Sequence, residues 1–483
     1  MDIDLSGGFA RWAQDFDDPS DWCVGFSLDS ASTTWVSTVP DDIWPGDIAV
    51  EDEDLGEGVD TLVTAVVTHT STAPTSEIRM VLIDKDGNSA YDDTFSANTG
   101  TAQPFCRHPV VEVTYSRGEN DTVGVARIHV VWSQFTDGGL QDDHWDLYYR
   151  YLKYVVDDED TEVDWDSPDT DTTVQLPFCT YDDELEPDIC VLATVNDLFV
   201  TYLLDDGPQG YDYIKGARHQ QSYMEYPGTW STSSTISGSS RYEKFAPRID
   251  GGIFTYRHSA MHAVGGLAAV WNENVSTAGT EWQVFYNDCD PLSGWTGTPV
   301  QISPRYDPET PYFNYLPQVD ITPQSSGINE AVIAWSSACP TSTVVRDVMI
   351  TATPYLNEAV QIITGEEIAV YNQCPDVACY QMYDEDEHWF GLSTYGHDTA
   401  NSAWDYYVYR FSLEVVYGEH GYATFSFEDK VDNPAEGQWN WQNPFTGPTL
   451  CLRWPVTPVV QTLFGLGWVD EDYMIQLTEG DIY

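Results

Sequence analysis

Basic residues are scarce in this sequence. Its 483 residues include 19 lysines and arginines, only five of them lysine, against 79 aspartates and glutamates, so the formal net charge is -60. Such a surface repels nucleic acid and anionic membranes, which excludes simple binding to phosphate backbones. It suits high salt, or divalent cations held by acidic loops. Salt adaptation of a solvated surface and true Ca²⁺ sites both remain open, and Ca²⁺ is the only cofactor that we consider.

Long apolar runs are also missing. No stretch reaches the roughly 18 apolar residues that a membrane span needs, so we expect no membrane insertion. The start "MDIDLSGGFARWAQDF" lacks the basic and apolar regions of a secretory signal. A trimmed mature protein, a cytoplasmic protein and a virion component all fit that start. Our prediction for the location is extracellular, on a cell surface or on a virion surface.

The nine cysteines show no CxxC pair with zinc spacing and no CxxCH haem motif. Cys374 with Cys379, or Cys179 with Cys190, could form a local disulfide in an oxidising compartment. Buried free thiols are the equal alternative. The motifs GxSxG, HExxH and the P-loop are absent, which removes several enzyme classes from consideration.

What the chain has instead is a repeat. A proline followed two residues later by a β-branched residue recurs in "HPVVEV", "EPDICV", "APRIDG", "LPQVDI", "CPDVAC" and "TPVVQT", with a looser copy in "WPGDIAV". These prolines are Pro45, Pro109, Pro187, Pro247, Pro317, Pro375 and Pro458, so the period is near 70 residues. Proline suits the first residue of a strand, where it interrupts no ladder of hydrogen bonds. The repeat therefore predicts similar β-units that each begin at a proline.

Each start is followed by an apolar segment such as "IHVVWSQ" and then by alternating aromatic residues, as in "WDLYYRYL". Such runs are typical of strands, and almost no helical pattern is present. Four antiparallel strands repeated seven times predict an all-β, seven-bladed β-propeller in a single domain, 1–483. The last blade lacks an outer strand, which we expect an N-terminal strand at about 33–40 to supply, closing the ring. A pair of β-sandwiches is the structural alternative, and six or eight blades remain open.

The approximate blade starts are 45, 109, 187, 247, 317, 375 and 458, and 414–447 is predicted to be a long decorated loop. Trp132, Trp271 and Trp335 recur near the end of the second strand, where we expect them to pack between blades. Trp295, Trp439 and Trp441 lie outside that pattern and are the candidate ligand-binding residues.

The proline start, "VVW" and "WDLYYR" resemble the repeats of sialidase-like and BNR-repeat β-propellers. That family usually carries turns of the form S-x-D-x-G-x-x-W, to which "SLDSASTTW" and "NDCDPLSGW" are degenerate matches. The resemblance implies an arginine cluster that clamps a sugar carboxylate. Arg107, Arg248 and Arg453, close to first strands of different blades, are the weak catalytic candidates. Ion pairs with neighbouring carboxylates are the alternative role of these arginines.

Acidic residues recur on the expected innermost strands, where their alternation with apolar residues predicts that they line a central channel. They are Glu112, Asp188, Asp250, Asp320 and Asp376. In "DKDGN", Asp84, Asp86 and Asn88 have the alternating oxygens of a Ca²⁺ loop, although a tight Asp-Gly turn is the simpler interpretation.

Taken together, these features favour a non-catalytic β-propeller that binds glycans or proteins, or assembles, outside cells or on a particle. A sialidase-like glycoside hydrolase and a structural subunit of a larger assembly are the alternatives. Whether the protein is an enzyme therefore stays open, with binding preferred. The expected partner is a glycan or protein surface, and self-association is left open.

Overall fold

The protein is an all-β chain. The computed structural model describes residues 9–14, 21–27, 34–35, 39–40, 47–51, 62–72, 75–83, 89–97, 105–117, 123–137, 143–157, 167–180, 182–192, 197–205, 211–222, 225–238, 242–252, 266–275, 281–290, 294–295, 298–303, 313–321, 330–338, 346–356, 360–361, 370–381, 388–398, 403–416, 422–432, 449–453, 462–469 and 475–482. Strands occupy most of these residues and none of them is helical, which confirms the all-β part of the prediction. Accordingly, the described residues contain no helix that could cross a membrane. Contacts divide the chain into two compact units, residues 1–189 with 467–477 and residues 190–466 with 478–483.

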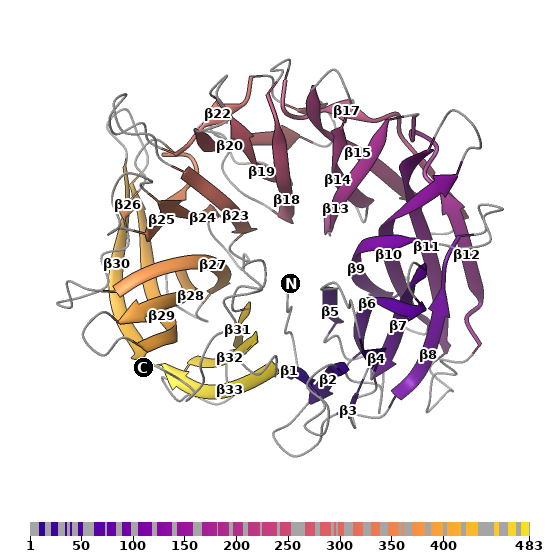
Figure 1. Ribbon diagram of the computed structural model, residues 1–483, viewed down its shortest axis with the longest axis horizontal. Helices are drawn as coiled ribbons and strands as arrows, with labels where there is room; N and C mark the ends of the chain where they lie inside the picture. The colour runs from indigo at the N-terminus through magenta and orange to yellow at the C-terminus, as the bar shows by residue number, and fades with distance from the viewer. Residues whose placement is uncertain are drawn as a thin grey trace. The chain divides into compact units, whose positions relative to one another are not determined.

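The first unit contains three antiparallel sheets of four strands each (Figure 1). The first sheet holds β1 (Phe9–Gln14), β2 (Asp21–Ser27), β3 (Thr34–Trp35) and β4 (Val39–Pro40). The second holds β5 (Asp47–Glu51), β6 (Leu62–Thr72), β7 (Thr75–Ile83) and β8 (Ser89–Phe95). The third holds β9 (Cys106–Arg117), β10 (Val123–Asp137), β11 (Asp143–Asp157) and β12 (Thr170–Gln175). In the second and third, each strand pairs with the next one in the chain.

The next sheets repeat this meander. One holds β13 (Asp183–Leu192), which crosses the unit boundary, β14 (Asp197–Asp205), β15 (Asp212–Ser222), β16 (Glu225–Trp230) and β17 (Ser234–Thr235). Another holds β18 (Lys244–Gly252), β19 (Gly266–Asn274), β20 (Trp282–Asp290), β21 (Gly294–Trp295) and β22 (Val300–Gln301). The third holds β23 (Phe313–Ile321), β24 (Ala331–Ala338), β25 (Arg346–Ala352) and β26 (Val360–Gln361). First strands of neighbouring sheets touch within the second unit, as β18 and β23 do.

Two sheets complete the chain. The first holds β27 (Val370–Gln381), β28 (His388–Asp398), β29 (Ala403–Val416) and β30 (Tyr422–Asp432). The last holds β31 (Thr449–Arg453), β32 (Thr462–Val469) and β33 (Ile475–Ile482). The described strands thus form eight sheets, so the expected count of seven is not confirmed.

The N-terminal segment differs from its prediction. β3 and β4, which cover the expected closing strand at 33–40, pair with β2 in a sheet of their own. The sequence hid this because β1 and β2 precede the first proline start and have no counterpart in the repeat. Closure of the strands into one ring stays a prediction.

The predicted loop at 414–447 is corrected in its first part. β29 runs to Val416, and residues 422–432 form β30, which pairs with β29 along its length. The segment "YATFSFEDKVD" alternates apolar and polar residues from Ala423 to Phe427, as a half-buried strand does. Residues 433–447 lie outside the described part of the chain.

In five sheets the repeated proline lies inside the first strand and does not begin it. Pro109 stands three residues into β9, and β13, β18, β23 and β27 likewise begin three to five residues before their proline. The residue before the proline has a positive φ in four sheets: 48° at His108, 50° at Glu186, 50° at Ala246 and 53° at Leu316. The pairing register shifts at this place in β9, β18, β23 and β27. The motif therefore marks a β-bulge, one of the few strand positions that tolerate proline.

This bulge is accompanied by a buried residue that we call the junction residue, three positions before the proline. It is Cys106 in β9, Glu184 in β13, Lys244 in β18 and Asn314 in β23, with exposed fractions of 0%, 0%, 3% and 1%. Cys106, Lys244 and Asn314 each have a hydrogen bond with the third strand of the preceding sheet. Ser76 Oγ and Cys106 O are 2.8 Å apart, and the Lys244 amide donates to Asp212 Oδ2 at 2.9 Å.

Trp132 and Trp335 pack between sheets, as predicted. Trp132, Trp271 and Trp335 are all 0% exposed. Trp132 packs in one cluster with Ile78 and Met80 of the neighbouring sheet, and Trp335 packs with Val270 and Tyr286. A buried tryptophan of this size contributes several kcal/mol, so these residues dominate the cohesion between sheets.

Candidate functional site

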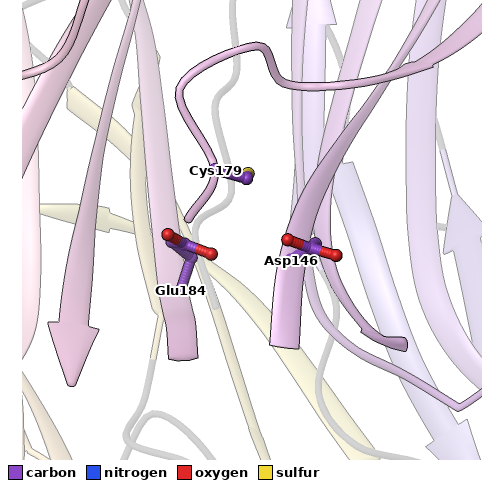
Figure 2. Close-up of side chains that lie close together, drawn as sticks. All are labelled: Asp146, Cys179 and Glu184. Carbon is purple, nitrogen blue, oxygen red and sulfur yellow. The ribbon is translucent and has the colours of Figure 1, made fainter. Parts of the chain in front are cut away.

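Three side chains of the first unit converge on one buried place. Asp146 comes from β11, Glu184 from the start of β13, and Cys179 from the segment between β12 and β13 (Figure 2). One carboxylate oxygen of Asp146, one of Glu184 and the Cys179 sulfur all lie within 4.8 Å of one another. Both acidic residues are 0% exposed. We refer to these three residues as the carboxyl–thiol cluster.

Glu184 is held by one of its two carboxylate oxygens. Its Oε1 accepts hydrogen bonds from the Thr180 amide at 2.8 Å and from the Thr180 hydroxyl at 2.9 Å. Its Oε2 is buried without a hydrogen-bond partner. Burial, together with the negative charge of Asp146, raises the pKa of Glu184 to about 8, although the bonds from Thr180 oppose the shift. One oxygen thus fixes the side chain, while the other is left for a further partner.

Asp146 is less well satisfied still. Neither of its carboxylate oxygens has a hydrogen-bond partner, although both are buried. The imidazole of His144 lies beside it, with Nε2 3.2 Å from Asp146 Oδ2. A buried carboxylate without bonded partners is costly, since it has lost the hydration that it had in the unfolded chain. A proton or a cation next to Asp146 would therefore stabilise this arrangement.

Cys179 contacts the backbone of β11. Its Sγ accepts a hydrogen bond from the Leu147 amide at 3.3 Å and lies 3.6 Å from Leu147 O. Burial and the neighbouring Glu184 raise the pKa of the thiol well above its usual range, so it is protonated at neutral pH. Neither Cys179 nor Cys379 takes part in a disulfide, so the suggested Cys179–Cys190 and Cys374–Cys379 disulfides do not form.

The second unit contains a matching pair that has different chemistry. Asp146 stands two residues before Tyr148, the strand partner of Trp132, and Gln283 stands two residues before Phe285, the strand partner of Trp271. Asp146 and Gln283 therefore occupy equivalent positions. Glu184 and Asn314 are equivalent as well, because both are junction residues. There, Asn314 Nδ2 donates to Gln283 Oε1 at 3.1 Å, so the two neutral amides share a hydrogen bond. In the first unit the same two places hold two carboxyl groups, which cannot pair in that way unless a proton or a cation lies between them.

The predicted arginines lie in both units. Arg107 lies over the rings of Phe105 and Trp145, with its guanidinium carbon 4.7 Å from each centroid, and Arg248 Nη1 donates to Pro247 O at 3.0 Å. Arg453 ends β31, and its side chain lies outside the described residues. Arg107 belongs to the first unit and the other two to the second, so their convergence stays a prediction.

The acids predicted to line a channel are partly engaged with backbone. Asp250 Oδ2 accepts a hydrogen bond from the Ile321 amide at 2.8 Å, and Asp320 Oδ2 accepts one from the Cys379 amide at 2.6 Å. Each bond joins the first strand of one sheet to the first strand of the next. Asp188 is 6% exposed and Glu112 is half-buried, while the side chain of Asp376 lies outside the described part.

Of the predicted ligand-binding tryptophans, only Trp295 is described. It is half-buried and packs against the cluster that includes Cys190, Phe199 and Leu267. Trp439 and Trp441 lie outside the described residues. So do Asp84, Asp86 and Asn88 of the suggested Ca²⁺ loop, between β7 and β8.

The carboxyl–thiol cluster was not expected from the sequence. Cys179 and Glu184 are five residues apart in "FCTYDDELEP", but Asp146 is 33 residues upstream of Cys179 in another strand. With 79 acidic residues in the chain, no spacing singles out these two. The usable signal was the repeat itself: Glu184 is an acid at a position where the other junction residues are Cys106, Lys244 and Asn314.

Comparisons with known proteins give only structural likeness. No family model matches the chain, and no curated protein matches it. An α-L-arabinofuranosidase from Fusarium graminearum is 12% identical, with a TM-score of 0.36 over 75% of this chain and 91% of that one. A GH43 endo-arabinanase from Bacillus licheniformis is 10% identical, with a TM-score of 0.26 over 63% and 92%. A levansucrase from B. megaterium is 9% identical, with a TM-score of 0.33 over 75% and 97%.

These three structures are not sialidases, so the finer resemblance to sialidase-like repeats is not confirmed. At such TM-scores the likeness extends to no particular site. Inferences about function therefore depend on the residues of this chain.

Proposed function

We propose that the protein is a non-catalytic β-propeller that binds glycans or other proteins outside cells or on a particle surface. The observation that carries this preference is the burial of the carboxyl pair. Asp146 and Glu184 are both 0% exposed, so a sugar could not reach them without the sheets opening. A glycosidase needs its two carboxyl groups on either side of the scissile bond.

The arrangement of the sheets supports a scaffold. Successive meanders, joined by bonds such as that from the Ile321 amide to Asp250, build a rigid frame. The segments between strands are free to vary on such a frame, and binding residues are commonly placed there. The net charge of -60 further favours use at high salt, where counterions screen self-repulsion.

A glycan array at molar salt, with and without Ca²⁺, tests the binding proposal. The expected result is binding that falls at least about tenfold in Trp439→Ala or Trp441→Ala, the size of a lost aromatic contact of about 1.4 kcal/mol. Trp295→Ala is the matched control, because that ring packs against core residues. Binding that Trp295→Ala weakens as much as the other two variants would contradict the assignment.

A glycoside hydrolase is the second candidate, and one observation favours it. A carboxyl group whose pKa is raised to about 8, beside a second carboxyl group, is the composition of a general acid and its partner. One carboxylate oxygen of Asp146 and one of Glu184 lie within 4.8 Å of each other. In retaining glycosidases the two catalytic carboxyl groups are roughly 5 Å apart.

Release of reducing sugar from arabinan, levan and sialosides separates the two candidates. The binding proposal predicts no turnover in the wild-type protein. Turnover that disappears in Glu184→Gln, with binding retained, would overturn it in favour of the hydrolase.

A further inference from the structure

We propose that the carboxyl–thiol cluster binds a thiophilic divalent metal ion of the Zn²⁺ class, as a closed site that joins the sheet of β9–β12 to β13. Asp146, Cys179 and Glu184 supply the ligands, and His144 Nε2 lies beside them only through Asp146, 3.2 Å from its Oδ2. This site is separate from the proposed glycan or protein binding, and neither depends on the other.

The first reason is the unmatched charge. Asp146 and Glu184 are completely buried, and three of their four carboxylate oxygens have no hydrogen-bond partner. Figure 2 shows the two carboxyl groups and the thiol at one place. A divalent cation neutralises two carboxylates and fills the coordination of the unpartnered oxygens in one step.

The second reason is the internal comparison. At the matching place, Asn314 Nδ2 donates to Gln283 Oε1 at 3.1 Å, and no thiol is part of that pair. Trp335 Nε1 donates to Asn314 Oδ1, and Ser303 Oγ donates to Gln283 Oε1. The fold therefore accommodates a neutral, hydrogen-bonded pair at this position. Two carboxyl groups there need a cation or a shared proton, whereas the amide pair needs neither.

The ligand types select the class of metal. Ca²⁺ takes six to eight oxygen ligands and avoids sulfur, whereas a thiolate with carboxylate and imidazole suits Zn²⁺ and similar ions. Oxygen and sulfur ligands on tetrahedral Zn²⁺ lie about 3.5 Å apart. The present spacing of within 4.8 Å therefore requires the side chains to move inward by roughly 1 Å.

The neighbouring groups suit a bound metal thiolate. When the metal–sulfur bond forms, the Cys179 thiol proton is released to solvent, and at neutral pH so is the carboxyl proton of Glu184. The Leu147 amide, which donates to Cys179 Sγ at 3.3 Å, then stabilises the thiolate. Thr180 continues to hold Glu184 Oε1 at 2.8 Å, so this ligand is oriented in advance.

Metal exchange on the full-length protein, at constant molar salt, tests the proposal. The metal-free protein is titrated with Co²⁺, and the thiolate-to-Co²⁺ charge-transfer absorption is recorded. We expect the wild-type protein to bind about one Co²⁺ ion per chain, and Zn²⁺ to displace it. In Cys179→Ser the charge-transfer absorption should be lost, and the Zn²⁺ affinity should fall by more than about 100-fold. Cys106→Ser is the matched control, because this buried thiol donates to Gln134 Oε1 at 3.4 Å and lies outside the cluster.

A second variant tests the charge directly. The double variant Asp146→Gln with Glu184→Asn copies the amide pair of the second unit, so its melting temperature should not respond to a chelator, whereas that of the wild-type protein should fall. If this double variant does not fold, the Co²⁺ spectrum of Cys179→Ser tests the proposal instead, and retained charge-transfer absorption would overturn it. The proposal is overturned if no transition ion binds, if Ca²⁺ binds in preference, or if the wild-type protein ignores the chelator, which would indicate a shared proton.

Discussion

Arg150 provides a sensitive test of how neighbouring sheets are held together in the first unit. It lies in β11, and its side chain is only 5% exposed. It donates to both oxygens of Asp171 at 3.0 and 2.8 Å and to Asp93 of the neighbouring sheet at 2.8 Å. Its guanidinium also lies 4.2 Å from the centroid of the Phe95 ring.

We expect Arg150→Met to destabilise the protein by about 2 to 3 kcal/mol. Hydrogen bonds to charged groups contribute roughly 1.5 to 3 kcal/mol each when buried, and a cation–π contact adds about 0.5 to 1 kcal/mol. The carboxylates of Asp93 and Asp171 are 36% and 41% exposed, however, so water recovers part of the loss. Arg150→Lys keeps the charge but loses the forked geometry, and should cost about half as much.

Arg79→Met is the matched control. Arg79 forms a similar two-point contact with Asp92, at 2.9 and 2.6 Å, but within one sheet and with 20% and 43% of the two side chains exposed. Such a surface pair contributes at most about 1 kcal/mol. Urea unfolding at fixed molar salt measures both changes. Equal destabilisation by the two variants would refute the claim that Arg150 joins the sheets.

Three further predictions concern the repeat and the charge. Ala246→Gly should leave the free energy of unfolding unchanged or raise it by up to about 1 kcal/mol, because glycine accepts the φ of 50°. Ala269→Gly inside β19 should lower it by a similar amount or more. Equal effects of the two variants on urea unfolding would contradict the bulge. Asp320→Asn should cost about 1 kcal/mol by weakening the bond from the Cys379 amide at 2.6 Å, and hydrogen exchange at that amide should accelerate; unchanged exchange would argue against the bond. The melting temperature should rise steadily as NaCl increases to molar concentration, because the net charge of -60 is screened; a flat profile would contradict salt adaptation.

The sequence predicted the number of repeats only approximately, but it located most of them. First strands β5, β9, β13, β18, β23 and β27 lie within about five residues of the predicted starts. The role of the proline was wrong, since a proline and its constrained predecessor fit a bulge as well as a strand start. The last start, Pro458, lies outside the described residues.

The candidate site could not be predicted because its residues meet only through the pairing of strands. Asp146 and Glu184 belong to different sheets, and nothing local distinguishes them from the other acids. Their significance appears only when the register of β11 is aligned with that of β20. In that alignment Asp146 occupies the position equivalent to Gln283. A repeat alignment extended to the third strand would have exposed the exchange of amides for acids.

The central claim is that the buried carboxyl pair of the first unit coordinates a metal where the matching pair of the second unit needs none. Anomalous diffraction from crystals of the Zn²⁺-loaded protein, recorded on both sides of the zinc absorption edge, tests it most directly. The account predicts one peak bounded by Asp146, Cys179 and Glu184, and none beside Gln283 and Asn314. A featureless map at the carboxyl pair, with its two groups in direct hydrogen-bond contact, would contradict it.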